Sequence, residues 1–578
     1  MIYIRRSIFR TIIYLSFLFL GLNLFYMQLV RYPFYRQRSQ DNRIRIIPIE
    51  SPRGVIYDRN GNALVNNRIS FDLAVIPQET GNIKVTLESL SKLSGIPQKT
   101  LYKNYRKNYL APFLPTTVEQ DLDKQLAFFL DENIASVPGA IISANLRRDY
   151  LKPEALSHIT GYIGKMDEAE YKILKEYGYK IREYVGKTGI EKQYNSYLRG
   201  EDGGIQVEVD ASSRQVKQLG YKTPQKGKDL YLTIDLGLQE VIAGLMEGET
   251  GACIVTDTRT GEVLALVSSP GYDPNSFVDP TKGNQRAELL TQKNHPMLNR
   301  AISSAYPPGS IFKIVVSDAA LSSGKLTENM YFTCNGAFFL GKARFGCWKE
   351  SGHGSQNVVE GLTHSCNVFF YNTGKLIGPD LISQYASKFG LGQFTYIDLP
   401  LETNGLVPSP LWKRVTRNQA WQGGDTLNFA IGQGDLLVSP IQALRMVTIV
   451  ANKGFAPRPY LVKKIGDLNT QNSTFSKTGI FDAENEFDIV QKGLYGVVNS
   501  PTGTGQLAKH ETLKICGKTG TAQVAGHDPH AWFVGYAPYE NPRISFVVFL
   551  EHGVAGGIRP ARMAGALCKY MQEKGYFN

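Results

Sequence analysis

Ser310 and Lys313 are spaced so that one could attack a carbonyl group while the other accepts the proton. They lie in the stretch Tyr-Pro-Pro-Gly-Ser-Ile-Phe-Lys at 306–313. Pro-Pro-Gly cannot continue a helix but can lead into one, so we expect a helix to begin at or beside Ser310. The hydroxyl would then lie near free backbone N–H groups and the positive end of the helix dipole. Lys313, at i+3 among apolar neighbours, would be desolvated, and its lowered pKa would suit a base.

Motif order and sequence context together favour this copy of Ser-x-x-Lys over others. Two further copies exist: Ser89 with Lys92, and Ser322 with Lys325. A solvated serine and lysine on a helix is the ordinary explanation of any one copy. Downstream of Ser310 come first Ser365-Cys366-Asn367 and then Lys518-Thr519-Gly520-Thr521. This trio of elements is typical of serine β-lactamases and penicillin-binding proteins.

The second and third motifs also have competing copies: Ser143 with Asn145, Ser355 with Asn357, 187–189 and 477–479. Of the Lys-Thr-Gly copies, only the one at Lys518 is followed by a segment that can pair beside it as a strand. That segment is His-Ala-Trp-Phe-Val-Gly-Tyr-Ala-Pro at 530–538.

Longer segments extend the pattern, at 52–61, at 232–239 and at 424–434. With them, the chain resembles the class B penicillin-binding proteins, which are monofunctional peptidoglycan transpeptidases, and most of all the elongation-type penicillin-binding protein 2. The resemblance spans nearly the whole sequence. It implies an α/β (α+β) transpeptidase fold, with an antiparallel sheet flanked by helices and a helical subdomain. A mixed, extended N-terminal module and one transmembrane helix would precede that fold.

The resemblance also implies roles for the first two motifs. Ser310 would be the nucleophile and Lys313, uncharged through burial and a neighbouring cation, its base. Ser365 would relay a proton towards the leaving amine, while Asn367 holds Lys313 and the substrate amide.

The third motif would bind the substrate carboxylate. In Lys518-Thr519-Gly520-Thr521, the lysine supplies a cation that attracts the carboxylate and keeps Lys313 neutral, and both threonines offer hydroxyl groups. The backbone N–H groups of Ser310 and Thr521 would form the oxyanion hole.

The implied substrate is the D-alanyl-D-alanine end of a cell-wall stem peptide, and β-lactams would acylate the same serine. Two other classes of function remain open. One is a non-catalytic β-lactam sensor or a scaffold for a membrane glycosyltransferase. The other is a D,D-carboxypeptidase or β-lactamase that hydrolyses, although a β-lactamase needs no membrane anchor and no long preceding module.

Composition limits the class of protein. At 578 residues the chain should hold two to four domains, and 42% hydrophobic residues suffice for real cores. The net charge of +12 is not accompanied by a recognisable nucleic-acid-binding module. It suits an anionic neighbourhood instead, such as membrane lipid or an acidic wall polymer.

The apolar run at 12–30 is long enough to cross a bilayer as a helix. Arg5, Arg6 and Arg10 precede it, so the positive-inside rule places the N-terminus in the cytoplasm and the rest in the periplasm. The run is too long for a cleaved signal peptide and no small-x-small site follows it, which favours an uncleaved anchor in the cytoplasmic (inner) membrane.

Five segments follow from this organisation: a cytoplasmic segment at 1–11, the transmembrane helix at 12–30, an extracytoplasmic pedestal or dimerisation-type module at 31–219, a linker at 220–229 and the transpeptidase domain at 230–578. Strands are predicted at 71–76 and 230–234, a hairpin at 251–267, and helices at 167–177 and 564–574. No glycosyltransferase module is visible. The implied partner is therefore a membrane glycan polymerase of the SEDS family, with other proteins of an elongation complex.

Three cysteines and a histidine fall within one short window: Cys334, Cys347, His353 and Cys366. Together they are a complete tetrahedral zinc set, and four protein ligands would make the metal structural. The alternatives are a disulfide between Cys334 and Cys347, or no bridge of any kind. The other cysteines (Cys253, Cys516 and Cys568) have apolar neighbours and are predicted to be buried and inert.

Overall fold

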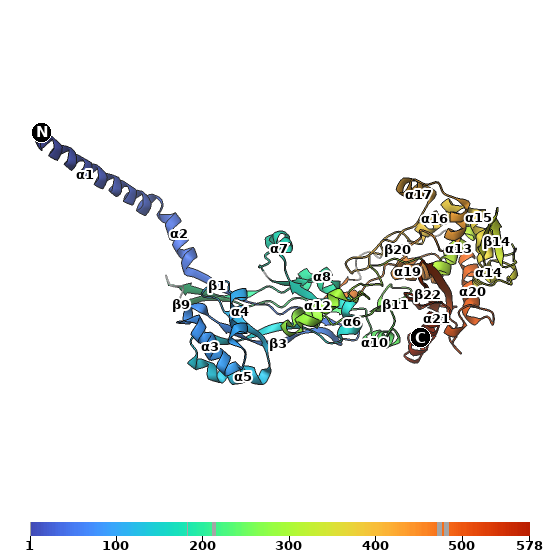
Figure 1. Cartoon of the computed structure of the whole chain (residues 1–578), viewed down its shortest axis with the longest axis horizontal. Helices are drawn as coiled ribbons and strands as arrows, with labels where there is room; N and C mark the ends of the chain where they lie inside the picture. Colours follow the sequence, from blue (N-terminus) through green and yellow to red (C-terminus); the bar gives the residue numbers. More distant parts are fainter. Residues whose placement is uncertain (1, 182, 211–214, 471–476, 479–484, 578) are drawn as a thin grey trace. The chain divides into compact units, whose positions relative to one another are not determined.

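The chain is described by a computed structural model that covers residues 2–181, 183–210, 215–470, 477–478 and 485–577 (Figure 1). It divides into two compact units that alternate along the sequence. The first unit comprises Met1–Arg53, Arg68–Arg147 and Arg199–Gly227, and the second comprises Gly54–Asn67, Arg148–Leu198 and Lys228–Asn578. The strand β3 (Ala63–Val75) contributes residues to both units and contains most of the strand predicted at 71–76.

The second unit is built on a five-stranded antiparallel sheet in the order β12-β11-β23-β22-β21. The strands are β11 (Gly251–Asp257), β12 (Val263–Ser269), β21 (Cys516–Val524), β22 (His527–Ala537) and β23 (Ile544–Leu550). The predicted hairpin at 251–267 is confirmed as β11 and β12. The segment at 530–538 lies in β22 and pairs with the strand that carries Lys518, as predicted.

The two faces of this sheet bury different cores because side chains alternate along each strand. On one face, Trp532 and Val534 pack with the helix α19 (Pro440–Ala451). On the other, Phe533 packs in a core with residues of α10 (Leu236–Leu245) and α21 (Arg559–Glu573). Such a layered core explains why the central strands are continuously apolar rather than alternating.

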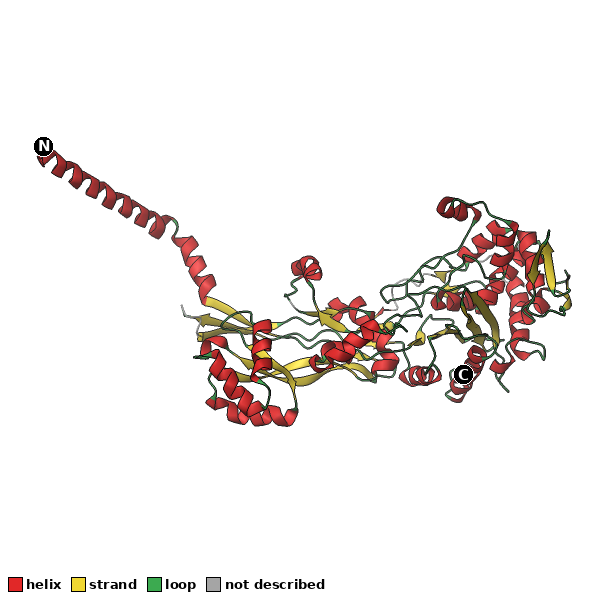
Figure 2. Ribbon diagram, in the orientation of Figure 1, coloured by secondary structure: helices red, strands yellow, loops and turns green. Residues whose placement is uncertain are grey.

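Helices form most of the rest of the second unit (Figure 2). The segment 309–322 folds as a 3₁₀ turn, η6 (Gly309–Phe312), followed by the buried helix α13 (Lys313–Ser322). Around α13 lie α14 (Val358–Thr363), α15 (Asn367–Ile377), α16 (Pro379–Lys388) and α20 (Asn485–Asn499). Further helices are α6 (Pro153–Thr160), α7 (Glu168–Leu174), α8 (Gly189–Gln193), α17 (Pro410–Arg417) and α18 (Gly423–Ala430).

Two predicted helices begin or end elsewhere than expected. The helix predicted at 167–177 is α7 followed by a 3₁₀ turn at Lys175–Tyr177, and Asp167 caps it through a capping box. The helix predicted at 564–574 is part of α21, which begins earlier, at Arg559, with a proline in its first turn.

The first unit contains a three-stranded sheet in the order β1-β8-β9, made of β1 (Ile44–Ile49), β8 (Gly203–Val209) and β9 (Gln215–Lys222). It also contains β4 (Thr116–Leu122), which pairs with β3, and the helices α3 (Ile83–Ser94), α4 (Gln98–Asn108) and α5 (Lys124–Asn133). The linker predicted at 220–229 is partly strand, because β9 reaches Lys222 and Gln225 exchanges backbone hydrogen bonds with Glu201.

The N-terminal segment is helical: α1 (Ile2–Phe25) continues as a π-helical turn at Tyr26–Val30. Within it, Arg6–Val30 is long and apolar enough to span a membrane. The chain thus carries one candidate membrane span near its N-terminus, which contains the run predicted at 12–30.

Candidate active site

The three motifs meet in the second unit. Ser310 lies in η6 and Lys313 is the first residue of α13. Ser365 sits between α14 and α15, and Asn367 is the first residue of α15. The motif 518–521 occupies the centre of β21, whose residues contact η6.

The two lysines converge on one serine hydroxyl. Lys313 Nζ donates to Asn367 Oδ1 at 2.7 Å, to the carbonyl of Ser365 at 2.9 Å and to Ser365 Oγ at 3.3 Å. Lys518 Nζ donates to Ser365 Oγ at 2.9 Å and to the carbonyl of Thr519 at 3.2 Å. Ser365 Oγ therefore bridges the two amines, as a proton relay must.

Both lysines are fully buried. Burial lowers the pKa of Lys313 to about 8, and burial and then the charge of Lys313 lower the pKa of Lys518 well below its usual value. Two ammonium groups that share one hydroxyl in a dry site repel each other, so near neutral pH one of the two amines is uncharged. Lys313 also faces the ring of Phe370, with Nζ 5.4 Å from the ring centroid.

Ser310 is the predicted nucleophile. Within the part of the chain that the structure describes, no hydrogen bond reaches the Ser310 hydroxyl, and the side chain is half-buried. Catalytic hydrogen bonds are commonly loose without substrate and tighten in the complex. Ser310 and Lys313 lie three residues apart across the junction of η6 and α13.

Glycines bring η6 against β21 and against the turn after α18. Gly309 has φ +55°, and a Cβ there would come 2.6 Å from the carbonyl oxygen of Thr521. Its N–H donates to the carbonyl of Gly432 at 2.9 Å. A Cβ on Gly520 would similarly lie 2.8 Å from the carbonyl oxygen of Pro308. Only glycine permits backbones this close, so these positions fix the nucleophile beside the Lys-Thr-Gly strand.

Ser365 holds a left-handed backbone conformation, φ +53°, which is uncommon for a residue with a side chain. The neighbouring Cys366 caps α15, since its sulfur accepts from the N–H of Phe369 at 3.5 Å. The loop that carries Ser365 is thus fixed on both sides, by α15 and by the two lysines.

Sequence reasoning missed two contributors. Thr504 Oγ1 lies 2.8 Å from Thr519 Oγ1 and so orients a hydroxyl of the third motif. The carbonyl of Gly346 accepts from Asn367 Nδ2 at 3.3 Å and from the Tyr371 hydroxyl at 3.3 Å. The Thr-Gly-Thr-Gly run at 502–505 was a signal for the first. A backbone acceptor such as the Gly346 carbonyl leaves no signal in the sequence.

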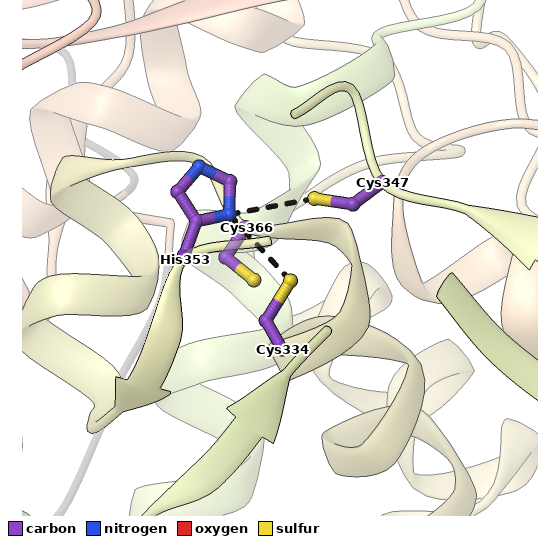
Figure 3. Close-up of side chains that lie close together, drawn as sticks. All are labelled: Cys334, Cys347, His353 and Cys366. Carbon is purple, nitrogen blue, oxygen red and sulfur yellow. Dashed lines mark hydrogen bonds between the residues drawn. The ribbon is translucent and has the colours of Figure 1, made fainter. Parts of the chain in front are cut away.

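The predicted zinc ligands also come together (Figure 3). The ligand atoms of Cys334, Cys347, His353 and Cys366 all lie within 4.8 Å of one another. His353 Nδ1 faces the sulfur of Cys334 at 3.6 Å and that of Cys347 at 3.5 Å. Three sulfurs and one imidazole nitrogen around a common centre fit a tetrahedral zinc ion in both number and chemistry.

All six cysteines are free thiols and all are buried. Burial raises the pKa of Cys253 to about 12 and raises those of Cys516 and Cys568 further. These three thiols therefore stay protonated and unreactive, as the sequence predicts.

Competing motif copies lie elsewhere. Lys187 forms an ion pair with Glu170. Ser89 and Lys92 lie on α3 in the first unit, where Lys92 pairs with Glu88. Gly479, the last residue of the copy at 477–479, lies outside the described residues.

Comparison with known sequences identifies the family. Residues 251–568 match the penicillin binding protein transpeptidase domain, and residues 48–232 match the penicillin-binding protein dimerisation domain. The peptidoglycan D,D-transpeptidase MrdA of Escherichia coli K12 is 35% identical over 562 residues, 92% of this chain and 88% of that protein. The chain belongs to the penicillin-binding protein 2 family of peptidoglycan D,D-transpeptidases. The corresponding Haemophilus influenzae transpeptidase is 32% identical over 95% of this chain and 88% of its own.

Solved structures agree on the fold of this penicillin-binding protein. One is penicillin-binding protein 2 of Helicobacter pylori in complex with MreC, with a TM-score of 0.83 at 30% identity, covering 92% of this chain and 100% of that one. Another is Pseudomonas aeruginosa penicillin-binding protein 2 in complex with WCK 5153, with a TM-score of 0.70 at 30% identity, covering 91% and 96%. The transpeptidase fold and the enzyme class predicted from sequence are thereby confirmed.

Proposed function

We propose that this transpeptidase cross-links cell-wall stem peptides through an acyl-enzyme on Ser310 during wall elongation. The observation that carries the proposal is the chain of hydrogen bonds from Asn367 and Lys313 through Ser365 Oγ to Lys518. Lys313 directly follows the 3₁₀ turn that contains Ser310. With Ser310 as the nucleophile, these groups supply what acyl transfer also needs, a base and a proton relay.

The first half-reaction consumes the donor peptide. Lys313, as the free amine, takes the proton of the Ser310 hydroxyl while its oxygen bonds to the carbonyl carbon between the two D-alanines. The backbone N–H groups of Ser310 and Thr521 stabilise the oxyanion. The carbon–nitrogen bond then breaks, and terminal D-alanine leaves as an amine that receives a proton through Ser365.

The second half-reaction transfers the acyl group. An amine on a neighbouring strand attacks the ester carbonyl, its proton passes to the site, and the bond to Ser310 breaks as the serine regains its proton. Lys518, Thr519 and Thr521 hold the terminal carboxylate of the donor before acylation. Gly520 keeps their strand within backbone contact of the turn before Ser310.

The span at Arg6–Val30 supports a single-pass anchor. We place the N-terminus in the cytoplasm and the catalytic unit in the periplasm, because arginines precede the span. The H. pylori relative forms a complex with MreC, and another relative, 30% identical, belongs to a peptidoglycan synthase complex that coordinates polymerization and crosslinking. We therefore propose an MreC-like protein and a SEDS-family glycan polymerase as partners of this chain.

We further propose that Cys334, Cys347, His353 and Cys366 hold a structural zinc ion. The convergence of their ligand atoms supports it, as does the position of Cys366 between Ser365 and Asn367. When bound, zinc would link the loops that carry its ligands, without an open position for water. The role of these four side chains would be to hold the loop of Ser365 in place beside the two lysines.

The decisive experiment labels the protein with a penicillin and locates the adduct by mass spectrometry. Ser310→Ala should abolish labelling, whereas Ser89→Ala, in a competing Ser-x-x-Lys copy of the first unit, should label like the native protein. Labelling that survives Ser310→Ala would place the nucleophile elsewhere. Product analysis with an added acceptor amine then separates transfer from hydrolysis, since a carboxypeptidase releases D-alanine without a cross-linked product.

A further inference from the structure

A short hairpin lies beside the helix that carries Asn367. Its strands, β14 (Ala337–Leu340) and β15 (Ala343–Gly346), are antiparallel, with Phe338 opposite Phe345 and Phe339 opposite Arg344. Figure 1 shows β14 next to α15 in the second unit, and the two elements are in contact. Of its residues, Gly346 holds Asn367 through its carbonyl, and the side chains on the outer face take no part in the acyl transfer described above.

The inner face of the hairpin is packed. The rings of Phe338 and Phe345 lie 6.1 Å and 5.8 Å from the ring of Tyr371 on α15. Leu340, on the same face as Phe338, lies against the start of α18, where a Cβ on Gly423 would come 2.9 Å from it. The hairpin is therefore fixed in position by one of its two faces.

The outer face is open and carries an apolar ring and a cation. Phe339 is 63% exposed, and Arg344, directly across from it, is exposed as well. No described acidic side chain pairs with Arg344 or with Lys342 in the turn. The stretch 335–349 holds three cations, Lys342, Arg344 and Lys349, and no acidic residue. An exposed aromatic ring and a guanidinium without a described acidic partner, side by side on one face, together complement a ligand that carries a carboxylate beside an apolar part.

The same strand reaches the candidate active site. Gly346 is the last residue of β15, and its carbonyl accepts a hydrogen bond from Asn367 Nδ2. The Oδ1 atom of the same asparagine accepts from Lys313 Nζ. The guanidinium of Arg344 folds back toward this end, since a Cβ on Gly346 would lie 3.8 Å from Arg344 Nη1. The strand that carries Arg344 is thus connected to the proposed base, Lys313, through Gly346 and Asn367.

We propose that the outer face of β14 and β15 is a subsite for the peptidoglycan strand, in which Arg344 pairs with a stem-peptide carboxylate and Phe339 packs on its apolar part. The proposal rests on the proposed function and adds a residue that selects anionic stems. A guanidinium fork suits a carboxylate better than an ammonium does, because it donates two parallel hydrogen bonds. Arg344 is a specificity residue in this assignment and takes no part in the chemistry.

The test measures binding without turnover. Full-length Ser310→Ala protein in detergent is titrated with a soluble, uncross-linked peptidoglycan strand that has free stem carboxylates, and with the same strand after amidation. Adding Arg344→Glu should weaken binding of the free strand about tenfold or more, while the amidated strand should lose this dependence. Arg344→Lys should bind the free strand with an affinity between those of the Arg344 protein and of Arg344→Glu. Phe339→Ala should weaken both strands alike.

Arg414→Glu, an equal charge change at an exposed arginine on α17, is the matched control. An equal loss in Arg344→Glu and Arg414→Glu would reduce the effect to general attraction and overturn the subsite. Unchanged strand binding in Arg344→Glu would also overturn the subsite. If Arg344→Glu instead weakened the binding of a partner protein and left strand binding unchanged, the hairpin would be a protein contact. Penicillin labelling of the native chain tests Ser310 separately, so failure of the proposed function and failure of the subsite give different results.

Discussion

At the scale of single residues, the candidate site depends on one of its two lysines being uncharged. Lys313 and Lys518 are both fully buried, both donate to Ser365 Oγ, and both have lowered pKa values. Lys313 Nζ has three hydrogen-bond acceptors and Lys518 Nζ has two. This geometry allows either amine to carry the shared proton. A substrate carboxylate beside Lys518 would draw the charge there and leave Lys313 as the free base.

The pH dependence of acylation follows from this arrangement. Burial lowers the pKa of Lys313 to about 8, so below that pH the ammonium form predominates and cannot accept a proton. We expect the rate of acylation by a fluorescent penicillin to rise about tenfold per pH unit from pH 6 and to level off above about pH 8. Lys313→Arg, which keeps the charge but cannot release it, should be inactive. A rate that falls as pH rises would mean that protonated Lys313 is the working form.

At the scale of elements, the site is a junction of short segments rather than one rigid surface. Ser365 and Asn367 flank Cys366, the third motif lies on β21, and the other three proposed zinc ligands come from the segment between Cys334 and His353. A metal ion would link these loops through four ligand bonds.

Metal analysis tests this element-scale proposal. Protein purified without chelators should contain about one zinc ion per chain, and Cys334→Ser should lose it, whereas Cys568→Ser, in the core on α21, should keep it. Removing the metal should lower the melting temperature by several degrees and slow penicillin acylation. Metal-free native protein with two fewer titratable thiols would favour the disulfide between Cys334 and Cys347.

The turn after α18 offers a second test at this scale. Gly432 and Gly434 both have positive φ, +75° and +81°. A Cβ on Gly432 would meet the carbonyl oxygen of Gly309 at 2.1 Å, whereas the nearest atom at Gly434 is 4.0 Å away. Gly434→Ala should cost only the backbone strain, about 1–2 kcal/mol. Gly432→Ala should also displace η6 and slow penicillin acylation at least tenfold, and equal rates in the two variants would contradict this positioning role.

At the scale of the whole molecule, the candidate site belongs to one of the two compact units. All residues of the three motifs lie within Lys228–Asn578. That unit also takes in Gly54–Asn67 and Arg148–Leu198, where the buried ion pair of Arg148 and Glu191 joins distant stretches of chain. The N-terminal span lies in the other unit.

Removal of residues 1–30 should therefore separate anchoring from chemistry. We expect the shortened protein to stay in the supernatant after ultracentrifugation and to be acylated by penicillin within about twofold of the native rate, because all residues of the three motifs lie in the other compact unit. The full-length protein should sediment with membranes and resist a carbonate wash. Loss of acylation on truncation would show that the span is needed for the fold of the catalytic unit.

The sequence alone determined which residues to examine. The Pro-Pro-Gly that precedes it and the motifs downstream favoured Ser310 among three Ser-x-x-Lys copies, and apolar runs located the strands at 251–267 and the span at 12–30. These features are local or depend on order along the chain, so they are visible without coordinates. The interleaving of the two units and the strand character of the predicted linker were not visible, because both depend on pairing between distant segments.

Only the tertiary structure placed Ser365 Oγ between two lysine amines, set Thr504 against Thr519, and turned Phe339 and Arg344 outward beside the site. Each of these relations joins groups that are distant along the chain or on opposite strands. Their distances follow from how sheet and helices pack, and a linear pattern of residue types does not contain that information.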